Sequence, residues 1–228
     1  GDAGVRIGSR PPVAFVDFIQ NHDQVGNRAL GERLTTLAQE SHLRAANALV
    51  LLSPMVPMLF MGEEWGERQP FLFFTDYQGE LARAVTEGRR EEFKRFSKFS
   101  EPGAAAWIPD PNDYQTFVAS RPRPDQGDDS WRAHCRELLE LRQRWLTPRL
   151  PGSRALDAQP LGERALSAKW RLGDGSLWRI DLNLGTHDLG VEPPGESAQV
   201  LFCCGQNAAH YRHGWLSGGA LVLSLEAP

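Results

Sequence analysis

Two short apolar runs, separated by a predicted helix, constrain the fold of this chain more than any other feature. Residues 13–19 read VAFVDFI and residues 56–60 read VPMLF. Runs of this kind, without alternating polar side chains, are typical of strands covered on both faces, as in a parallel sheet with helices outside. The helix is predicted over 41–52, with Ser41 as its N-cap. This order predicts an α/β architecture, and both open doubly wound sheets and closed (β/α)8 barrels fit it.

Near residue 150, the predicted secondary structure changes from helices and loops to strands. An irregular loop is predicted from residue 61 to about 86, and helices are predicted over 88–96 and 130–145. Beyond residue 155 the helical period disappears, and Gly173-Asp174-Gly175 is expected to form a hairpin turn. Strands are predicted over 164–172, 176–184, 198–204 and 220–225. We therefore expect two domains, 1–152 and 153–228, the second a small antiparallel β domain.

Charge and cysteine usage exclude several classes of protein. The chain carries 25 Lys and Arg against 29 Asp and Glu, interspersed rather than in blocks, which argues against a nucleic-acid partner. It contains no apolar stretch long enough to span a membrane and no pattern of a secretory signal near its start. Cys135, Cys203 and Cys204 do not form a disulfide framework or a zinc motif. We expect a cytoplasmic protein without a metal or another cofactor.

A dense polar segment follows the first predicted strand. Residues 20–28 read QNHDQVGNR. The carboxyl ends of parallel strands are where ligands bind in α/β sheets and barrels, and a site that must hydrogen-bond many hydroxyls needs such a set of amides, an imidazole and a carboxylate. Sugar hydrolysis passes through an oxocarbenium-like transition state, which an ionised carboxylate such as Asp23 can stabilise. For a lone His-Asp pair, however, a turn or a helix cap remains the commoner role.

The combination of motifs resembles the α-amylase family of glycoside hydrolases. Asn21-His22-Asp23 after a strand is similar to the fourth signature region of that family. The extension over 24–29, followed by Gly31 and Arg33-Leu34, resembles its trehalohydrolase members in particular. Residues 54–66, PMVPMLFMGEEWG, are similar to the eighth barrel strand and its loop, and residues 138–142 are similar to the end of the last barrel helix.

This resemblance implies a fold and a reaction. The fold is the last portion of a (β/α)8 TIM barrel, about strands 7–8, followed by a small antiparallel β-sandwich domain. The reaction is retaining hydrolysis of the α-1,4 bond next to the terminal trehalose unit of malto-oligosyltrehalose or a related α-glucan. Asp23 is then the transition-state stabiliser, and His22, Gln24 and Asn27 are substrate-binding residues. The assignment requires Asp23 to face a sugar cleft.

The resemblance also implies that the partner is the amino-terminal part of the same enzyme. The family's nucleophilic Asp follows strand four and its acid Glu follows strand five, and neither motif occurs in these 228 residues. We therefore expect the chain alone to be inactive. Glu63, Glu64 and Trp65 lie in the loop after the second strand, where a contact with substrate and a purely structural role both remain open.

Two other functions remain open from the sequence. One is that of another α-amylase-family glucosidase or branching enzyme, which the extension over 24–28 disfavours. The other is a non-catalytic carbohydrate-binding β module, in which Trp170, Trp178 and Trp215 would form the platform for the sugar.

Overall fold

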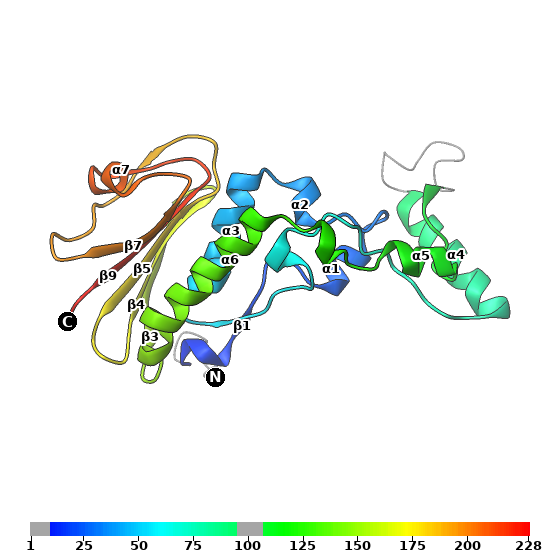
Figure 1. Ribbon diagram of the computed structural model, residues 1–228, viewed down its shortest axis with the longest axis horizontal. Coiled ribbons are helices and arrows are strands. Elements are labelled where there is room, and N and C mark those ends of the chain that lie inside the picture. Colours follow the sequence, from blue (N-terminus) through cyan, green and yellow to red (C-terminus); the bar gives the residue numbers. More distant parts are fainter. Residues whose placement is uncertain (1–9, 95–106) are drawn as a thin grey trace, which may run out of the picture. The chain divides into compact units, whose positions relative to one another are not determined.

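The computed structural model describes residues 10–94 and 107–228, which fall into two compact units. The first unit contains the described residues of 1–19 together with 38–58 and 132–228 (Figure 1). The second contains 20–37 and the described residues of 59–131. Two long segments of the chain therefore leave the first unit and return to it.

The two apolar runs form a short parallel pair in the first unit. Strand β1 (Val16–Asp17) pairs with β2 (Val56–Pro57), and Val16 lies opposite Val56. The backbone N–H groups of Val56 and Met58 donate to the carbonyls of Phe15 and Asp17, both at 2.9 Å. Helix α3 (Glu40–Leu52) connects the strands, so the predicted strand–helix–strand unit is confirmed. The helix has Gln39 rather than Ser41 at its N-cap, so that detail of the prediction was wrong.

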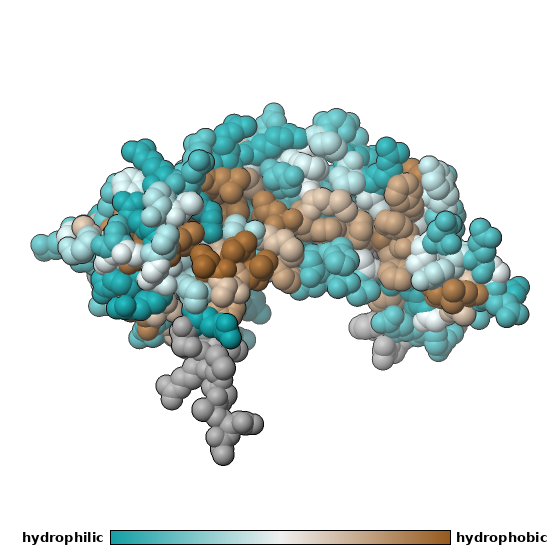
Figure 2. All heavy atoms as spheres, turned by 90° about the horizontal axis from the view of Figure 1, so that it is seen from below, coloured by the Kyte–Doolittle hydropathy of each residue, from teal (hydrophilic) through white to brown (hydrophobic). Residues whose placement is uncertain are grey.

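The parallel pair is not covered on both faces by this chain. Apolar side chains on the two strands and next to their ends are exposed, and Figure 2 shows apolar residues at the surface of the face seen from below. These exposed residues are Val13, Val16, Phe18, Val56 and Met58. The apolar runs predicted strands that are covered on both faces. Within the described residues, the two strands and their connecting helix leave part of this apolar surface exposed.

A half-buried arginine links the end of α3 to a second helix. Helix α6 (Asp129–Leu141) continues as a π-helical turn over Arg142–Leu146, followed by a 3-10 turn over Thr147–Arg149. The Arg142 guanidinium donates to the carbonyls of Leu51, Ser53 and Met55, at 2.9, 2.6 and 2.6 Å. The last carbonyls of a helix have no partner within it, so Arg142 satisfies groups that would otherwise be left unpaired. It thereby fixes the turn that leads from α3 into β2.

The β domain is built on a five-stranded antiparallel sheet with the order β3-β4-β5-β9-β7. Its strands are Arg154–Gly162, Ala165–Arg171, Leu177–Asn183, Ala220–Glu226 and Gln199–Cys204, in that order. Four of them were predicted, whereas β3 was missed. Trp170 pairs with Trp178, which pairs with Leu225, so all three lie on one face of the sheet. The Trp178 indole donates to the Leu52 carbonyl of α3 at 2.9 Å, so this face packs on α3.

The opposite face of the sheet carries a second core with a buried polar cluster. Short strands β6 (Leu189–Gly190) and β8 (Trp215–Leu216) pair with each other, and helix α7 (Ala208–Arg212) precedes β8. Tyr211 of α7 is fully buried and donates its hydroxyl to Asp181 of β5, which also pairs with Arg179 at 2.9 Å. Val191, Leu216, Ala220 and Val222 pack around Tyr211. This layer was not predicted, because its strands are only two residues long.

Two of the three tryptophans of this domain are buried, and its two cysteines are half-buried. Trp178 is fully buried and Trp170 is 7% exposed, so they cannot form a sugar platform with Trp215. Cys203 and Cys204 pair with Val222 and Leu221, which places them on opposite faces of the sheet. Burial raises the pKa of each of these two thiols to about 11. No disulfide involves them or Cys135.

The second unit consists of short helices and loops. Its elements are α1 (His22–Gly26), α2 (Leu34–Leu37), η3 (Glu63–Trp65), α4 (Gly79–Lys94), α5 (Tyr114–Ala119) and η6 (Pro124–Gln126). Helix α4 begins at Gly79, so the prediction of a loop to residue 86 was wrong, and the end predicted at Phe96 lies outside the described residues. No helix among the described residues has the length and apolar character to cross a membrane.

Arg142→Lys tests the link between α3 and α6. A single ammonium group cannot reach three carbonyls in the way the planar guanidinium does, so we expect a loss of about 2–4 kcal/mol of unfolding free energy. Arg136→Lys, at an exposed position of the same helix, is the matched control and should change the unfolding free energy by less than about 0.5 kcal/mol. Urea unfolding measures both, and equal effects of the two substitutions would contradict the role of Arg142.

Candidate functional site

The polar segment after β1 folds as the short helix α1. Asn21 is its N-cap, and the Asn21 side chain accepts from the backbone N–H of Gln24 at 2.9 Å. This bond is the reason why the chain turns into a helix here, since the first N–H groups of a helix need outside acceptors. Val25 and Gly26 face inward, while His22, Asp23, Gln24 and Asn27 are exposed.

The structure therefore places three of the four predicted site residues on one short helix and the fourth, Asn27, at its C-cap. The His22 imidazole lies 3.4 Å from the Asp23 carboxylate. Their side chains are 71% and 73% exposed, so Asp23 does not face a closed cleft formed by this chain alone. The backbone N–H of Asn27 donates to the Asp23 carbonyl, which completes a turn of helix between them. The arrangement leaves an imidazole, a carboxylate and two amides exposed on α1 and at its C-cap.

The start of α1 is anchored by the residue before its cap. Gln20 is 3% exposed, and its side-chain amide donates to Glu63 at 2.9 Å. Its amide oxygen accepts from the backbone N–H of Leu34 at 3.2 Å. One side chain therefore joins the entry of α1 to η3 and to the start of α2.

Glu63 is the buried partner of Gln20. Its side chain is 6% exposed, and its second oxygen accepts from the backbone N–H of Phe60 at 2.7 Å. Burial raises the pKa of Glu63 to about 7, although these two hydrogen bonds and the charge of Arg33 oppose the shift. The adjacent Glu64 accepts from the backbone N–H of Gly62, and Trp65 donates to Glu67. The three residues whose roles were open thus have structural partners within the loop.

The end of α1 is held by a second buried side chain, Arg89 of α4. Its guanidinium donates to the carbonyls of Gly26 and Arg28, at 2.7 and 2.8 Å, and it lies 4.7 Å from the centre of the Phe73 ring. Arg89 supplies a donor from outside the helix to the Gly26 carbonyl, and it adds a second donor to the Arg28 carbonyl, which also accepts from the Gly31 backbone N–H. The sequence assigned Arg89 to a charged helix and gave no sign that it is buried.

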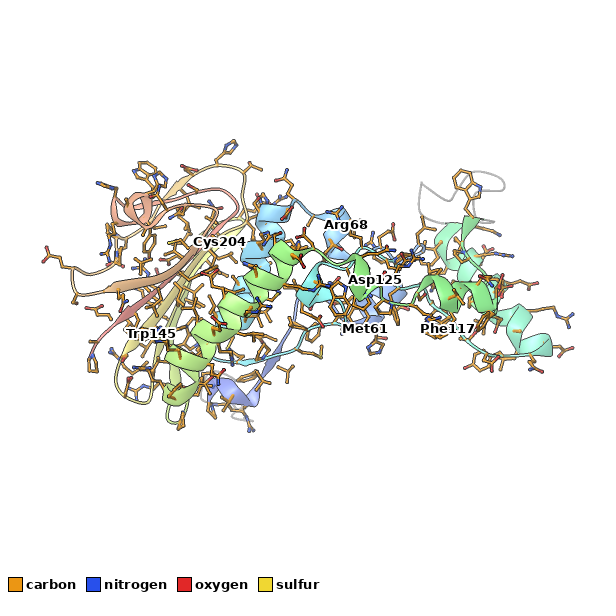
Figure 3. All side chains as sticks on the ribbon, viewed as in Figure 1. Met61, Arg68, Phe117, Asp125, Trp145 and Cys204 are labelled. Atoms are coloured by element: carbon orange, nitrogen blue, oxygen red, sulfur yellow. The ribbon has the colours of Figure 1, made fainter. Side chains whose placement is uncertain are left out.

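The loop over residues 59–71 is tied to the same framework. Arg33 is 1% exposed and donates to the carbonyls of Gln69 and Met61, at 2.7 and 2.8 Å. Gly31 accepts a backbone bond from Phe71, and a Cβ at Gly31, whose φ is +59°, would lie 2.5 Å from the Phe71 carbonyl oxygen. A larger residue cannot occupy that position. Figure 3 labels two residues of this loop, Met61 and Arg68.

The aromatic residues of this loop pack mainly on one another. Phe71 lies edge-on to Phe60 and to Phe74, with ring centres 5.2 and 5.7 Å apart. In the described parts of the chain, no three His, Cys, Asp or Glu side chains are grouped so that they could hold a metal ion. The exposed groups of α1 offer hydrogen-bond donors and acceptors and one carboxylate at the surface, the kinds of group that the binding of sugar hydroxyls requires.

Comparisons with solved structures define the class. The chain resembles a putative α-amylase from Salmonella typhimurium, at 40% identity and a TM-score of 0.81, over 98% of this chain and 37% of that one. It also resembles isomaltulose synthase from Erwinia rhapontici NX5, with a TM-score of 0.59 at 14% identity, which is a likeness of fold alone. The chain therefore has the architecture of the carboxy-terminal part of α-amylase-family enzymes, the end of a (β/α)8 barrel followed by a β domain. The predicted fold class is confirmed.

The relatives found by sequence carry the name of one particular enzyme. The chain is 44% identical over 133 residues to a malto-oligosyltrehalose trehalohydrolase from Deinococcus radiodurans, and 52% identical over 114 residues to one from Arthrobacter ramosus. These matches cover 57% and 48% of this chain, and 22% and 19% of the relatives. A domain of unknown function, DUF3459, matches residues 153–223. The resemblance to trehalohydrolases, over their carboxy-terminal part, is confirmed, and the chain spans about a fifth of the length of these relatives.

Glu63→Gln is expected to change how stability depends on pH. The pKa of Glu63 in the folded protein is about 7, against an ordinary value of 4.5. Between these values the folded state keeps a proton that the unfolded chain has lost, so the unfolding free energy falls as pH rises through this window. The total is about 3 kcal/mol. Urea unfolding at pH 5 and pH 8 should show this fall in the original protein and not in the variant. Parallel behaviour of the two proteins would contradict it.

Proposed function

We propose that this chain is the carboxy-terminal part of a trehalohydrolase that acts on malto-oligosyltrehalose. The reaction would be retaining hydrolysis of the α-1,4 bond next to the terminal trehalose unit, with release of trehalose. The observation that supports it most is the set of exposed polar side chains on α1, soon after a parallel strand, together with sequence relatives of that name. The exposed apolar face of β1 and β2 is consistent with further strands in a longer polypeptide.

In this proposal Asp23 stabilises the transition state. Its ionised carboxylate would hold ring hydroxyls of the sugar being cleaved and favour the positive charge that develops there. His22 would bind the same sugar, and Gln24 and Asn27 would bind neighbouring hydroxyls. The nucleophile and the acid would come from the amino-terminal part of the enzyme, which would also form the other side of the cleft around Asp23. The chain alone should therefore release no trehalose.

The division into a catalytic part (1–152) and a β domain (153–228) is proposed on the same basis. The first strand of the β domain starts at Arg154, and the family match starts at residue 153. A cytoplasmic location, proposed from the cysteine usage, is consistent with the thiols of Cys203 and Cys204.

Asp23→Asn in the complete enzyme tests the proposed role. We expect kcat to fall by about 10²–10³-fold without loss of the fold, because one preorganised charge opposite the developing cation is removed. Asp125→Asn is the matched control, since Asp125 is exposed in the same unit and lies outside the polar segment (labelled in Figure 3). Trehalose release from malto-oligosyltrehalose is the measurement.

Two outcomes would contradict the proposal. A loss of tenfold or less in Asp23→Asn would show that the carboxylate is peripheral. Glucose or branched glucan as the product of the unaltered enzyme, instead of trehalose, would favour a glucosidase or a branching enzyme.

A further inference from the structure

The orientation of the Gln20 amide is fixed from two sides. Its oxygen accepts from the backbone N–H of Leu34, so its NH₂ group must point the other way. There it meets Glu63, which is 2.9 Å away and accepts. A rotated amide would set its NH₂ group against the N–H of Leu34, and two donors would face each other.

Glu63 is equally constrained. One of its oxygens accepts from Gln20 and the other from the backbone N–H of Phe60. Both neighbours are donors, so they suit the ionised form of Glu63, in which both carboxylate oxygens accept. Glu63 and Gln20 are 6% and 3% exposed, and water does not readily replace either bond. Arg33 and Glu64 are the charged groups near this carboxylate.

The position of α1 depends on this contact. Gln20 directly precedes Asn21, which caps the helix, and Asp23 is in its first turn. The side chains of His22 and Asp23 are 71% and 73% exposed and lie 3.4 Å from one another, so the described residues do not bury either of them. The direction in which Asp23 points is therefore set by the backbone, and the backbone is held at Gln20.

We propose that Glu63 is a positioning residue, which orients Asp23 by accepting a hydrogen bond from the Gln20 amide. This inference rests on the proposed role of Asp23 and adds a residue that does not touch the sugar. Misplacement of a catalytic group by about 1 Å lowers rates by about 10²-fold, while substrate binding at other subsites is retained.

The test is a double-substitution cycle in the complete enzyme. In Glu63→Gln, the amide at position 63 can satisfy only one of the two donors that face it. Gln20→Glu alone sets two carboxylates against each other. The combined Gln20→Glu and Glu63→Gln swap restores every bond: the carboxylate at position 20 accepts from Leu34 and from the amide at position 63, whose oxygen accepts from Phe60. Glu87→Gln, at an exposed position of α4, is the control.

With malto-oligosyltrehalose as substrate, Glu63→Gln should lower kcat by about 10- to 100-fold and change KM by less than about threefold. The swap should return kcat to within about fivefold of the original, and Glu87→Gln should leave it unchanged. A general structural defect would instead lower the amount of folded enzyme without this division between kcat and KM. If Glu63→Gln does not fold, Gln20→Met removes the same bond from the other side and should give the same fall in kcat.

Any one of three results would overturn the proposal. The folded Glu63→Gln or Gln20→Met enzyme could have a kcat within about threefold of the original. The swap could be no more active than the single variants, or the loss could appear in KM alone. If the unaltered enzyme releases trehalose and these results are found, only the positioning role of Glu63 fails. If it releases no trehalose, the proposed function fails and this inference fails with it.

Discussion

The buried hydrogen bond between the Gln20 amide and the Glu63 carboxylate is the contact on which the candidate site depends. It joins the residue before α1 to the loop after β2, and the same amide reaches α2. Arg89 and Arg33 complete this framework by donating to backbone carbonyls at the end of α1 and in the loop. The helix can therefore expose four polar side chains while its backbone stays fixed, which is what a site for a neutral, hydroxyl-rich ligand requires.

The framework has a cost in stability. A carboxylate at 6% exposure is desolvated, and burial raises the pKa of Glu63 to about 7. Residues kept in unfavourable surroundings are common where function sets the geometry. The first unit shows the opposite arrangement, since Arg142 satisfies the end of α3 and the Trp178 indole bonds to the same turn. There the buried polar groups stabilise the packing of helix and sheet.

Much of the fold was predictable because the strands and α3 have strong periodic or apolar signals. Strands β4, β5, β7 and β9 and the parallel pair were found, and the hairpin at residues 173–175 was marked by its glycines. The missed elements are short or polar: β3 is exposed along most of its length, and α4 carries many charges. The site residues on α1 were predicted from the polar segment and the family resemblance, but the burial of Glu63, Arg33 and Arg89 was not. Charged residues are usually solvated, and only tertiary contacts reveal the exceptions.

The role of Asp23 can be observed in a structure of the complete enzyme with malto-oligosyltrehalose bound, in a variant that lacks the nucleophile. We expect the Asp23 carboxylate to lie within hydrogen-bond distance, about 2.5–3.2 Å, of hydroxyls on the sugar at the scissile bond. We also expect Gln20 still to donate to Glu63 in that structure. A carboxylate that faces water, with the sugar bound elsewhere, would contradict the assignment of this segment.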